Sequence, residues 1–289
     1  MATISELINI GAAQLTAVGV SDARLTAALL LAQVLGCDRT YLLIHAYDEI
    51  AAYAQANYQQ LLMRRASGEP LQYIRGYQEF YGRDFLITPA VLIPRPETEL
   101  IIETVLKLTN TISATAPRIL DIGTGSGCIA VTLAAELPTA SVYALDISYE
   151  AIQVAKMNAL RLGVAARLHW LISDLCAALN DRLPSKAKFD FCCANPPYVA
   201  IEDQNTLARE VRDYEPQQAL FASERGLSII KRLFKESLPY LRAGGYLICE
   251  IGFGQEEKLL AEIDRDIWQP QETVKDLQGI PRTLVLKRS

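Results

Sequence analysis

One stretch of this chain restricts its fold more than any other: a short apolar strand, a glycine-rich turn and a helix follow one another without a gap. The strand begins at Arg118, and the turn and the start of the helix read DIGTGSGCIA from Asp121 to Ala130. Glycines at alternate positions let the backbone approach a ligand closely, and the free N–H groups at the start of a helix favour a polar or anionic group. This order of elements is typical of α/β folds that bind nucleotides.

The chain after Pro94 continues to alternate strand and helix signals, which predicts an α/β domain with a parallel sheet. We expect strands near residues 118 to 122, 141 to 146, 167 to 172, 189 to 194 and 245 to 251, with helices between them. Two late runs, Thr273-Val274 and Thr283 to Leu286, flank a Gly-Ile-Pro turn and are expected to pair as an antiparallel hairpin.

The first 75 residues follow a different pattern. Apolar residues recur there at helical spacing, with breaks at Gly19 to Asp22, Gly36 to Asp38 and Ser67 to Pro70, which predicts a small helical bundle. Aromatic residues on either side of Gly82 then indicate a β-hairpin. We therefore expect a helical domain over residues 1–75, a hairpin linker over 76–93 and the α/β domain over 94–289.

The glycine turn alone does not identify which nucleotide binds there. Gly125, Gly127 and Ala130 match the GxGxxG/A spacing of dinucleotide-binding folds, and Asp146 ends the strand that begins at Ser141, about where a ribose-binding acid belongs. A dehydrogenase cofactor would fit these residues, as would another nucleotide. Asp146 has a structural alternative as a turn or helix N-cap residue, because Ser148 and Glu150 follow at the start of a helix.

Residues 195 to 198 read Asn-Pro-Pro-Tyr directly after the apolar strand 189 to 194. The two prolines supply no backbone N–H, so Asn195 and the Pro196 carbonyl offer acceptors where the strand ends. Such a site selects a planar NH2 group, on whose flat face Tyr198 could stack while the nitrogen points at an electrophile on the opposite side. The alternative interpretation is a turn that simply ends the strand.

The glycine loop and the Asn-Pro-Pro-Tyr tetrapeptide together resemble an S-adenosylmethionine-dependent methyltransferase. Four further motifs narrow this resemblance to the HemK/PrmC family of peptide chain release factor N5-glutamine methyltransferases: Pro94 to Glu99 (PRPETE), Glu215-Pro216 with Ala219-Leu220, Glu250-Ile251-Gly252 with Gln255, and Asp276 to Gly279 with Arg282. The similarity extends nearly over the whole chain. It implies a seven-stranded Rossmann-like domain preceded by a helical domain that recognises the protein substrate, since a glutamine side chain alone carries too little information to select one target.

The resemblance also implies roles for individual residues. The loop Gly123, Thr124, Gly125, Ser126 and Gly127 is expected to hold the amino-acid moiety and ribose of S-adenosylmethionine, Asp146 the ribose hydroxyls and Asp174 the adenine amino group, with Leu175 bordering the adenine. Asn195, Pro196, Pro197 and Tyr198 are the expected catalytic and substrate-binding residues, and Asn195 also borders the cofactor. Glu97 and Glu99 have two possible roles: they could be charges at the N-terminus of a helix, or they could contact the substrate or cofactor.

The implied substrate is the Gly-Gly-Gln loop of bacterial class-one release factors. Glutamine in a ribosomal protein, adenine N6 in DNA and a non-catalytic binding module are the alternatives. A formal net charge of −5 lacks the basic excess that duplex DNA binding needs, so a protein substrate is favoured. No run of 18 apolar residues occurs and the first basic residue is Arg24, from which we expect a soluble, cytoplasmic protein. We also expect it to be a monomer. His45 and His169 lack ligand spacing and no CxxC pair occurs, so no metal is expected.

Overall fold

The computed structural model describes residues 2–112, 115–180 and 188–289. Two compact units make up the chain: unit 1 comprises Met1–Gly76 together with Ala208–Tyr214, and unit 2 comprises Tyr77–Leu207 together with Glu215–Ser289. The polypeptide therefore passes between the units three times. The N-terminal helices account for most of unit 1, but a seven-residue segment from the second half of the chain also belongs to it.

Unit 1 is a helical bundle, as the sequence predicts. Its helices are α1 (Ile4–Ala17), α2 (Ala23–Leu35), α3 (Arg39–Ile44), α4 (Ala52–Ala66), α5 (Leu71–Arg75) and α9 (Arg209–Tyr214). The helix ends follow local chemistry: Thr3 and Glu6 form a capping box at the start of α1, and Gly36 ends α2 in the left-handed conformation that favours glycine. The predicted breaks separate α1 from α2, α2 from α3 and α4 from α5, whereas the break between α3 and α4 contains no glycine or proline.

One close approach explains how α1, α2 and α4 pack. The Tyr58 side chain on α4 is buried, and its hydroxyl donates a hydrogen bond to the Ala27 carbonyl at 3.1 Å. A Cβ on Gly11 would lie 2.2 Å from that hydroxyl oxygen, so only glycine leaves room for it there. About two turns further along α4, Arg65 forms an ion pair with Glu210 of α9 at 2.6 Å, which ties the late segment to the bundle.

Unit 2 contains the α/β sheet. Seven strands run in the order β10-β12-β9-β6-β3-β4-β5, and the short β11 pairs with β12. The strands are β3 (Arg118–Ile122), β4 (Ser141–Asp146), β5 (Leu168–Ile172), β6 (Phe189–Ala194), β9 (Leu241–Glu250), β10 (Trp268–Pro270), β11 (Val274–Lys275) and β12 (Pro281–Arg288). The pairs of β3 with β4, β4 with β5, β3 with β6 and β6 with β9 are parallel, and β12 lies antiparallel to β9.

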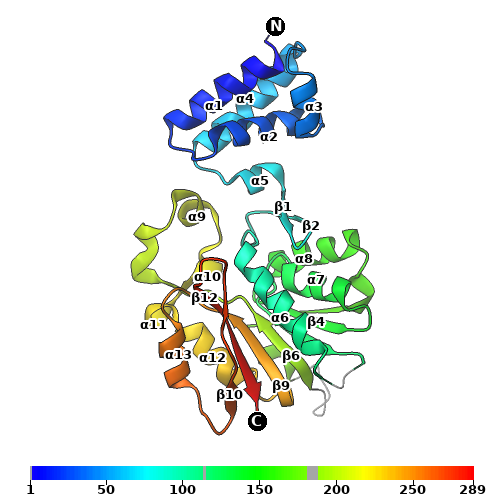
Figure 1. Ribbon diagram of the computed structural model, residues 1–289, viewed down its shortest axis with the longest axis vertical. Coiled ribbons are helices and arrows are strands. Elements are labelled where there is room, and N and C mark those ends of the chain that lie inside the picture. Colours follow the sequence, from blue (N-terminus) through cyan, green and yellow to red (C-terminus); the bar gives the residue numbers. More distant parts are fainter. Residues whose placement is uncertain (1, 113–114, 181–187) are drawn as a thin grey trace. The chain divides into compact units, whose positions relative to one another are not determined.

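Helices cover both faces of this sheet (Figure 1). On one face, α12 (Ser228–Glu236) and α13 (Glu256–Glu262) pack into an apolar core with side chains of β3, β6 and β9; on the other lie α6 (Glu99–Thr109), α7 (Cys128–Glu136) and α8 (Tyr149–Arg161). Shorter helical segments complete the unit: α10 (Gln217–Leu220), α11 (Ser223–Gly226), η1 (Pro96–Thr98), η2 (Ala165–Arg167), η3 (Ala177–Leu179) and η4 (Ile201–Thr206).

The predicted α/β fold with a parallel core is confirmed, and so is the late antiparallel hairpin, in which Val274 pairs with Thr283. The hairpin expected after residue 75 is present as β1 (Tyr77–Phe80) and β2 (Arg83–Leu86), which belong to unit 2. One member of the sheet was not predicted: β10 occupies the edge beside β12, while β11 pairs only with one end of it. A second small sheet, β7 (Val199–Ala200) with β8 (Phe221–Ala222), was not predicted either.

Candidate active site

The strand register brings the predicted ligand-binding residues to one edge of the sheet. Ile122 of β3 is paired with Leu145 of β4 on one side and with Ala194 of β6 on the other. The next residues along these three strands are Gly123, Asp146 and Asn195. Since the strands are parallel, their carboxyl ends meet at the same edge, where ligands of open α/β sheets bind.

A cleft in unit 2 opens at this edge, and most of the predicted residues line it. They are Gly123, Thr124, Gly125, Ser126, Asp146, Asp174, Leu175, Asn195 and Pro197. Gly127, in contrast, packs against α8: a Cβ there would lie 3.0 Å from the Ala155 Cβ, so this glycine permits close helix packing rather than ligand approach. The cleft is also lined by residues that carried no predicted role, among them Ala90 to Leu92 before the domain and Thr98, Gln218 and Ile229.

The glycine loop is shaped for close approach of a ligand. Gly123 and Gly125 have φ values of 76° and 55°, in the left-handed region, and a Cβ on either would meet nothing within 4 Å. Side chains at these positions would therefore extend into open space at the cleft. The loop is held at its base by backbone hydrogen bonds of 2.8 Å from the N–H groups of Gly123 and Thr124 to the Leu145 carbonyl.

Asp121, the acid that opens the loop motif, lies fully buried beneath it. Its Oδ2 accepts hydrogen bonds from the Thr124 hydroxyl at 2.6 Å and from the Ala130 backbone N–H at 3.2 Å, so it joins the two ends of the loop. Its other oxygen has no hydrogen-bond partner within the described chain. Burial raises the pKa of Asp121 to about 7, because the charged carboxylate is poorly solvated there.

Asp146 joins the end of β4 to the same loop. Its carboxylate accepts from the Gly125 backbone N–H at 2.8 Å and from the Ser148 backbone N–H at 2.9 Å. The N-cap of α8 is Ser148, whose hydroxyl accepts from the Ala151 N–H, so Asp146 orders the turn without capping the helix itself. Burial raises its pKa. A carboxylate has about four lone-pair sites, so Asp146 can still accept a hydrogen bond from a ligand in the cleft.

The residues expected at the adenine follow β5. Leu175 lines the cleft with φ 45°, a strained backbone conformation for a leucine, and strain of this kind clusters at functional sites. Asp174 also lines the cleft, but its carboxylate is half exposed and forms an ion pair of 3.0 Å with Arg232 of α12. A single carboxylate can keep this ion pair and still accept from an amino group.

Asn195 is held by residues from two distant parts of the chain. Its side-chain nitrogen donates to the Thr98 hydroxyl at 2.9 Å, and that hydroxyl donates to Glu250 Oε2 at 2.6 Å. The other Glu250 oxygen accepts from the Tyr198 hydroxyl at 2.9 Å. Thr98 and Glu250 are each 1% exposed. Sequence reasoning gave neither a role at the site, because 97 and 152 positions separate the bonded pairs.

The end of the tetrapeptide is enclosed on several sides. The Gln255 side chain donates to the Tyr198 carbonyl at 3.0 Å and accepts from the Gly252 N–H at 2.8 Å. A Cβ on Gly226 would lie 2.0 Å from the same Tyr198 carbonyl oxygen. Burial raises the pKa of the Tyr198 phenol, so it remains a neutral hydrogen-bond donor. Pro196 is buried beside it.

The remaining motif residues form pairs within unit 2. Arg95 and the buried Glu215 form an ion pair at 2.5 Å, and Arg282 and Asp276 form another at 2.9 Å. Glu99 accepts from the Tyr81 backbone N–H at 2.8 Å in the first turn of α6, which favours a structural role over a ligand contact. The first pair joins the segments next to Pro94 and Pro216, which line the cleft, and the second closes the turn between β11 and β12.

The cleft fits S-adenosylmethionine by two criteria. Gly123 and Gly125 leave space that a Cβ would fill, and Asp146 supplies carboxylate acceptors at the end of β4, where the ribose of a nucleotide lies in this fold class. Asn195, which follows the end of the third strand, lines the same cleft. The arrangement can hold a nucleotide and an NH2-bearing group in one enclosure.

Comparisons with known proteins agree with this geometry. Residues 6–76 match the PrmC N-terminal domain, and residues 97–212 match the methyltransferase small domain. The chain is 46% identical over 288 residues to a release factor glutamine methyltransferase of Koribacter versatilis, with 98% of each chain covered. It is 39% identical to the enzyme of the same description from Geobacter sulfurreducens, with 98% of this chain and 95% of the relative covered.

Solved structures with a similar fold include other methyltransferases. The hMettl16 catalytic domain in complex with a MAT2A 3'UTR hairpin superposes with a TM-score of 0.56 at 20% identity, covering 86% of this chain and 84% of that one. A T. thermophilus 16S rRNA methyltransferase in complex with AdoMet and guanosine gives a TM-score of 0.51 at 17% identity, covering 74% of this chain and 50% of that one. At these identities the likeness establishes the fold.

Proposed function

Because the chain belongs to the release factor glutamine methyltransferase family, we propose that it transfers a methyl group from S-adenosylmethionine to the side-chain amide nitrogen (N5) of a glutamine in a bacterial class-one release factor. The proposed target is the glutamine of the Gly-Gly-Gln loop. The observation that carries this proposal is the amide of Asn195, which lines the cleft while its own nitrogen is bonded to Thr98.

The residues at the cleft account for selection of an NH2 group. The nitrogen of Asn195 is engaged by Thr98, so its oxygen is the atom available to a substrate. Pro196 and Pro197 contribute carbonyls and no N–H. A glutamine NH2 group can donate both hydrogens to Asn195 and the Pro196 carbonyl, and these bonds hold the nitrogen lone pair toward the methyl donor.

Catalysis then depends mainly on alignment. S-adenosylmethionine supplies a methyl group already activated by its sulfonium. Asp146 and the glycine loop fix one reactant, and Asn195 with Pro196 fixes the other, which converts the transfer into an in-line reaction of two held groups. Hydrogen bonds from the substrate NH2 raise electron density on its nitrogen, and the methylated nitrogen loses its proton to solvent. No carboxylate is needed as a general base.

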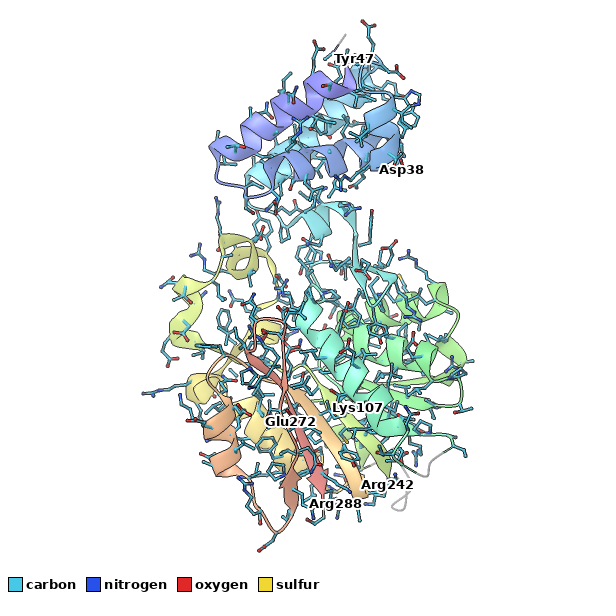
Figure 2. All side chains as sticks on the ribbon, viewed as in Figure 1. Asp38, Tyr47, Lys107, Arg242, Glu272 and Arg288 are labelled. Carbon is cyan, nitrogen blue, oxygen red and sulfur yellow. The ribbon has the colours of Figure 1, made fainter. Side chains whose placement is uncertain are left out.

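Substrate recognition is assigned to unit 1. Four large apolar side chains between residues 43 and 53 are strongly exposed there: Leu43 at 78%, Ile44 at 74%, Tyr47 at 88% and Tyr53 at 75%. Tyr47 points outward in Figure 2. Exposed apolar and aromatic residues at this density are typical of protein-binding surfaces, and a release factor is the protein that the proposed chemistry requires.

The proposal places the enzyme in the cytoplasm, where its release factor substrate is made. It also takes the enzyme to act as a monomer. Among the helices of the described chain, none has the length and apolar character to cross a bilayer.

A labelling experiment tests the function. The protein is incubated with methyl-labelled S-adenosylmethionine and, in separate reactions, a class-one release factor, the same factor with its Gly-Gly-Gln glutamine changed to alanine, a ribosomal fraction and plasmid DNA. Label on the intact factor alone is expected. Label that persists on the altered factor would move the target to another residue, and label only in ribosomal protein or DNA would replace the proposed substrate.

A further inference from the structure

Asn195 can serve as an acceptor only if its amide keeps one of two orientations. An asparagine side chain is nearly symmetric in shape, and a half-turn about its last bond exchanges the C=O and NH2 groups. With its oxygen toward the cleft, Asn195 accepts a hydrogen bond from a substrate NH2 group. With its nitrogen toward the cleft, the Asn195 NH2 group would face the substrate NH2 group, and two donors cannot form a hydrogen bond. The orientation therefore decides whether the substrate amide can bind.

This orientation depends on which neighbours of Asn195 can donate a proton in a hydrogen bond and which can only accept one. An ionised carboxylate only accepts hydrogen bonds, so the single hydroxyl proton of Thr98 is donated to Glu250 at 2.6 Å. The Thr98 oxygen is then left as an acceptor. Asn195 can meet it only with its NH2 group, at 2.9 Å, which turns the amide oxygen away from Thr98.

Glu250 is suited to direct this chain of bonds because it is buried and held on both sides. One of its oxygens receives the Thr98 hydroxyl and the other the Tyr198 hydroxyl at 2.9 Å. The charged groups that act on it are Glu97, on the segment before α6, and Arg282, on β12. Burial raises the pKa of Glu250, and the charge of Glu97 adds to this. The hydrogen bonds from the Thr98 and Tyr198 hydroxyls, and then the guanidinium of Arg282, favour the ionised form.

We propose that Thr98 and Glu250 are positioning residues that fix the Asn195 amide with its oxygen toward the cleft, and so make the site an acceptor for the substrate NH2. This inference rests on the proposed function for its substrate, although the orientation itself is a property of the free protein. Neither residue needs to touch the glutamine. Thr98 acts through its hydroxyl and Glu250 through Thr98.

Three threonine variants test the hydroxyl. Thr98→Val keeps the shape of the side chain and removes its hydroxyl, and Thr98→Ser keeps the hydroxyl. Thr104→Val is the matched control, because the Thr104 hydroxyl on α6 bonds the Leu100 carbonyl in its own helix and lies outside the site. We expect Thr98→Val to lower kcat roughly ten- to hundredfold, while the cofactor Kd changes by less than about twofold. Thr98→Ser should restore kcat to within about threefold, and Thr104→Val should retain it.

A second measurement needs no substrate. In protein labelled with 15N at asparagine, the Asn195 side-chain NH2 signal, assigned by its loss in Asn195→Ala, reports the hydrogen bond to Thr98. We expect this signal to shift in Thr98→Val and to keep its position in Thr98→Ser and Thr104→Val. Glu250→Gln, whose amide can donate or accept toward Thr98, should give a shifted or doubled signal and an intermediate loss of kcat.

The role of Thr98, the role of Glu250 and the proposed function would each be overturned by a different result. Wild-type kcat and an unshifted Asn195 signal in Thr98→Val would show that the hydroxyl does not orient the amide, and the same pair of results in Glu250→Gln would remove Glu250 from the role. If the wild-type protein fails to methylate the release factor, the proposed function fails, but the Asn195 signal still decides the orientation.

Discussion

The backbone N–H of Gly125 donates a hydrogen bond to the carboxylate of Asp146 across 2.8 Å, which joins the loop after β3 to the end of β4. Two of the elements proposed to hold the cofactor are therefore linked by the protein's own atoms. A substitution at either position is expected to affect the other, because the carboxylate that would receive the ribose also fixes the loop that would lie against the rest of the ligand.

Asp146→Ala is predicted to weaken S-adenosylmethionine binding by about 2 to 3 kcal/mol, since charge-assisted hydrogen bonds to the ribose are lost together with the Gly125 link. Asp146→Glu should also bind poorly, because the added methylene displaces the oxygens. Isothermal calorimetry on the folded variants gives both values. The control is Asp38→Ala, which removes a carboxylate that caps α3 in unit 1 (Figure 2) and should cost about 1 kcal/mol of stability with no change in affinity. Unchanged affinity in Asp146→Ala would leave Asp146 with its turn-ordering role alone.

Asn195→Ala is predicted to lower methyl transfer by roughly two to three orders of magnitude, the scale seen when one preorganised polar contact is removed. Cofactor binding should survive in part. Single-turnover assays with the release factor measure the chemical step. Asn9→Ala, which truncates an exposed asparagine of α1, is the control and should behave as wild type. Transfer within twofold of wild type in Asn195→Ala would exclude the proposed contact.

Gly226→Ala is predicted to destabilise the fold and reduce activity more than Gly254→Ala. Both glycines have positive φ, 84° and 72°, so each substitution carries backbone strain of roughly 1 kcal/mol. Only at Gly226 would the new Cβ also meet the Tyr198 carbonyl, at 2.0 Å, whereas nothing lies within 4 Å at Gly254. Urea denaturation of the two variants isolates the clash. Equal stabilities would mean that the tetrapeptide can shift without cost.

Asp121 predicts a pH dependence of stability. Its pKa rises from 3.8 to about 7 on folding, so the folded protein binds more protons between these values and loses stability as the pH rises through them. At 1.36 kcal/mol per unit this contribution is at most about 4 kcal/mol. Asp121→Asn should flatten the decrease in the free energy of unfolding between about pH 4 and pH 7. The slope, not the absolute stability, is the test, and a slope equal to that of wild type would contradict it.

Changes to the exposed apolar side chains between residues 43 and 53 of unit 1 should separate recognition from chemistry. Leu43→Ser with Tyr47→Ala is predicted to lower kcat/KM on intact release factor by about tenfold or more, because docking energy no longer helps to place the glutamine. Turnover of a short Gly-Gly-Gln peptide should be unchanged. Val18→Ser, at a residue 55% exposed elsewhere on unit 1, is the control. Equal efficiency of all three proteins on the intact factor would assign unit 1 another role.

The sequence allowed the strand ends of the site to be placed because each follows a local pattern. The strands that end at Ile122, Asp146 and Ala194 have the predicted carboxyl ends, and the parallel order sets their edge. Short edge elements such as β10 and β7 escaped prediction because two or three residues carry no periodicity. The Thr98–Glu250 link escaped for a different reason: it is a contact between segments 152 positions apart, and no local pattern encodes it.

The segment Ala208–Tyr214 bears on how this architecture can be rearranged by protein engineering. Because residues 1–76 share their compact unit with this segment, the helical bundle is not formed by the N-terminal residues alone. A chimera that exchanges only residues 1–76 with a relative would pair a foreign α4 with the native α9 and put at risk the ion pair of Arg65 with Glu210. To transfer substrate specificity between relatives, we therefore expect that residues 1–76 and the segment Ala208–Tyr214 must be exchanged together.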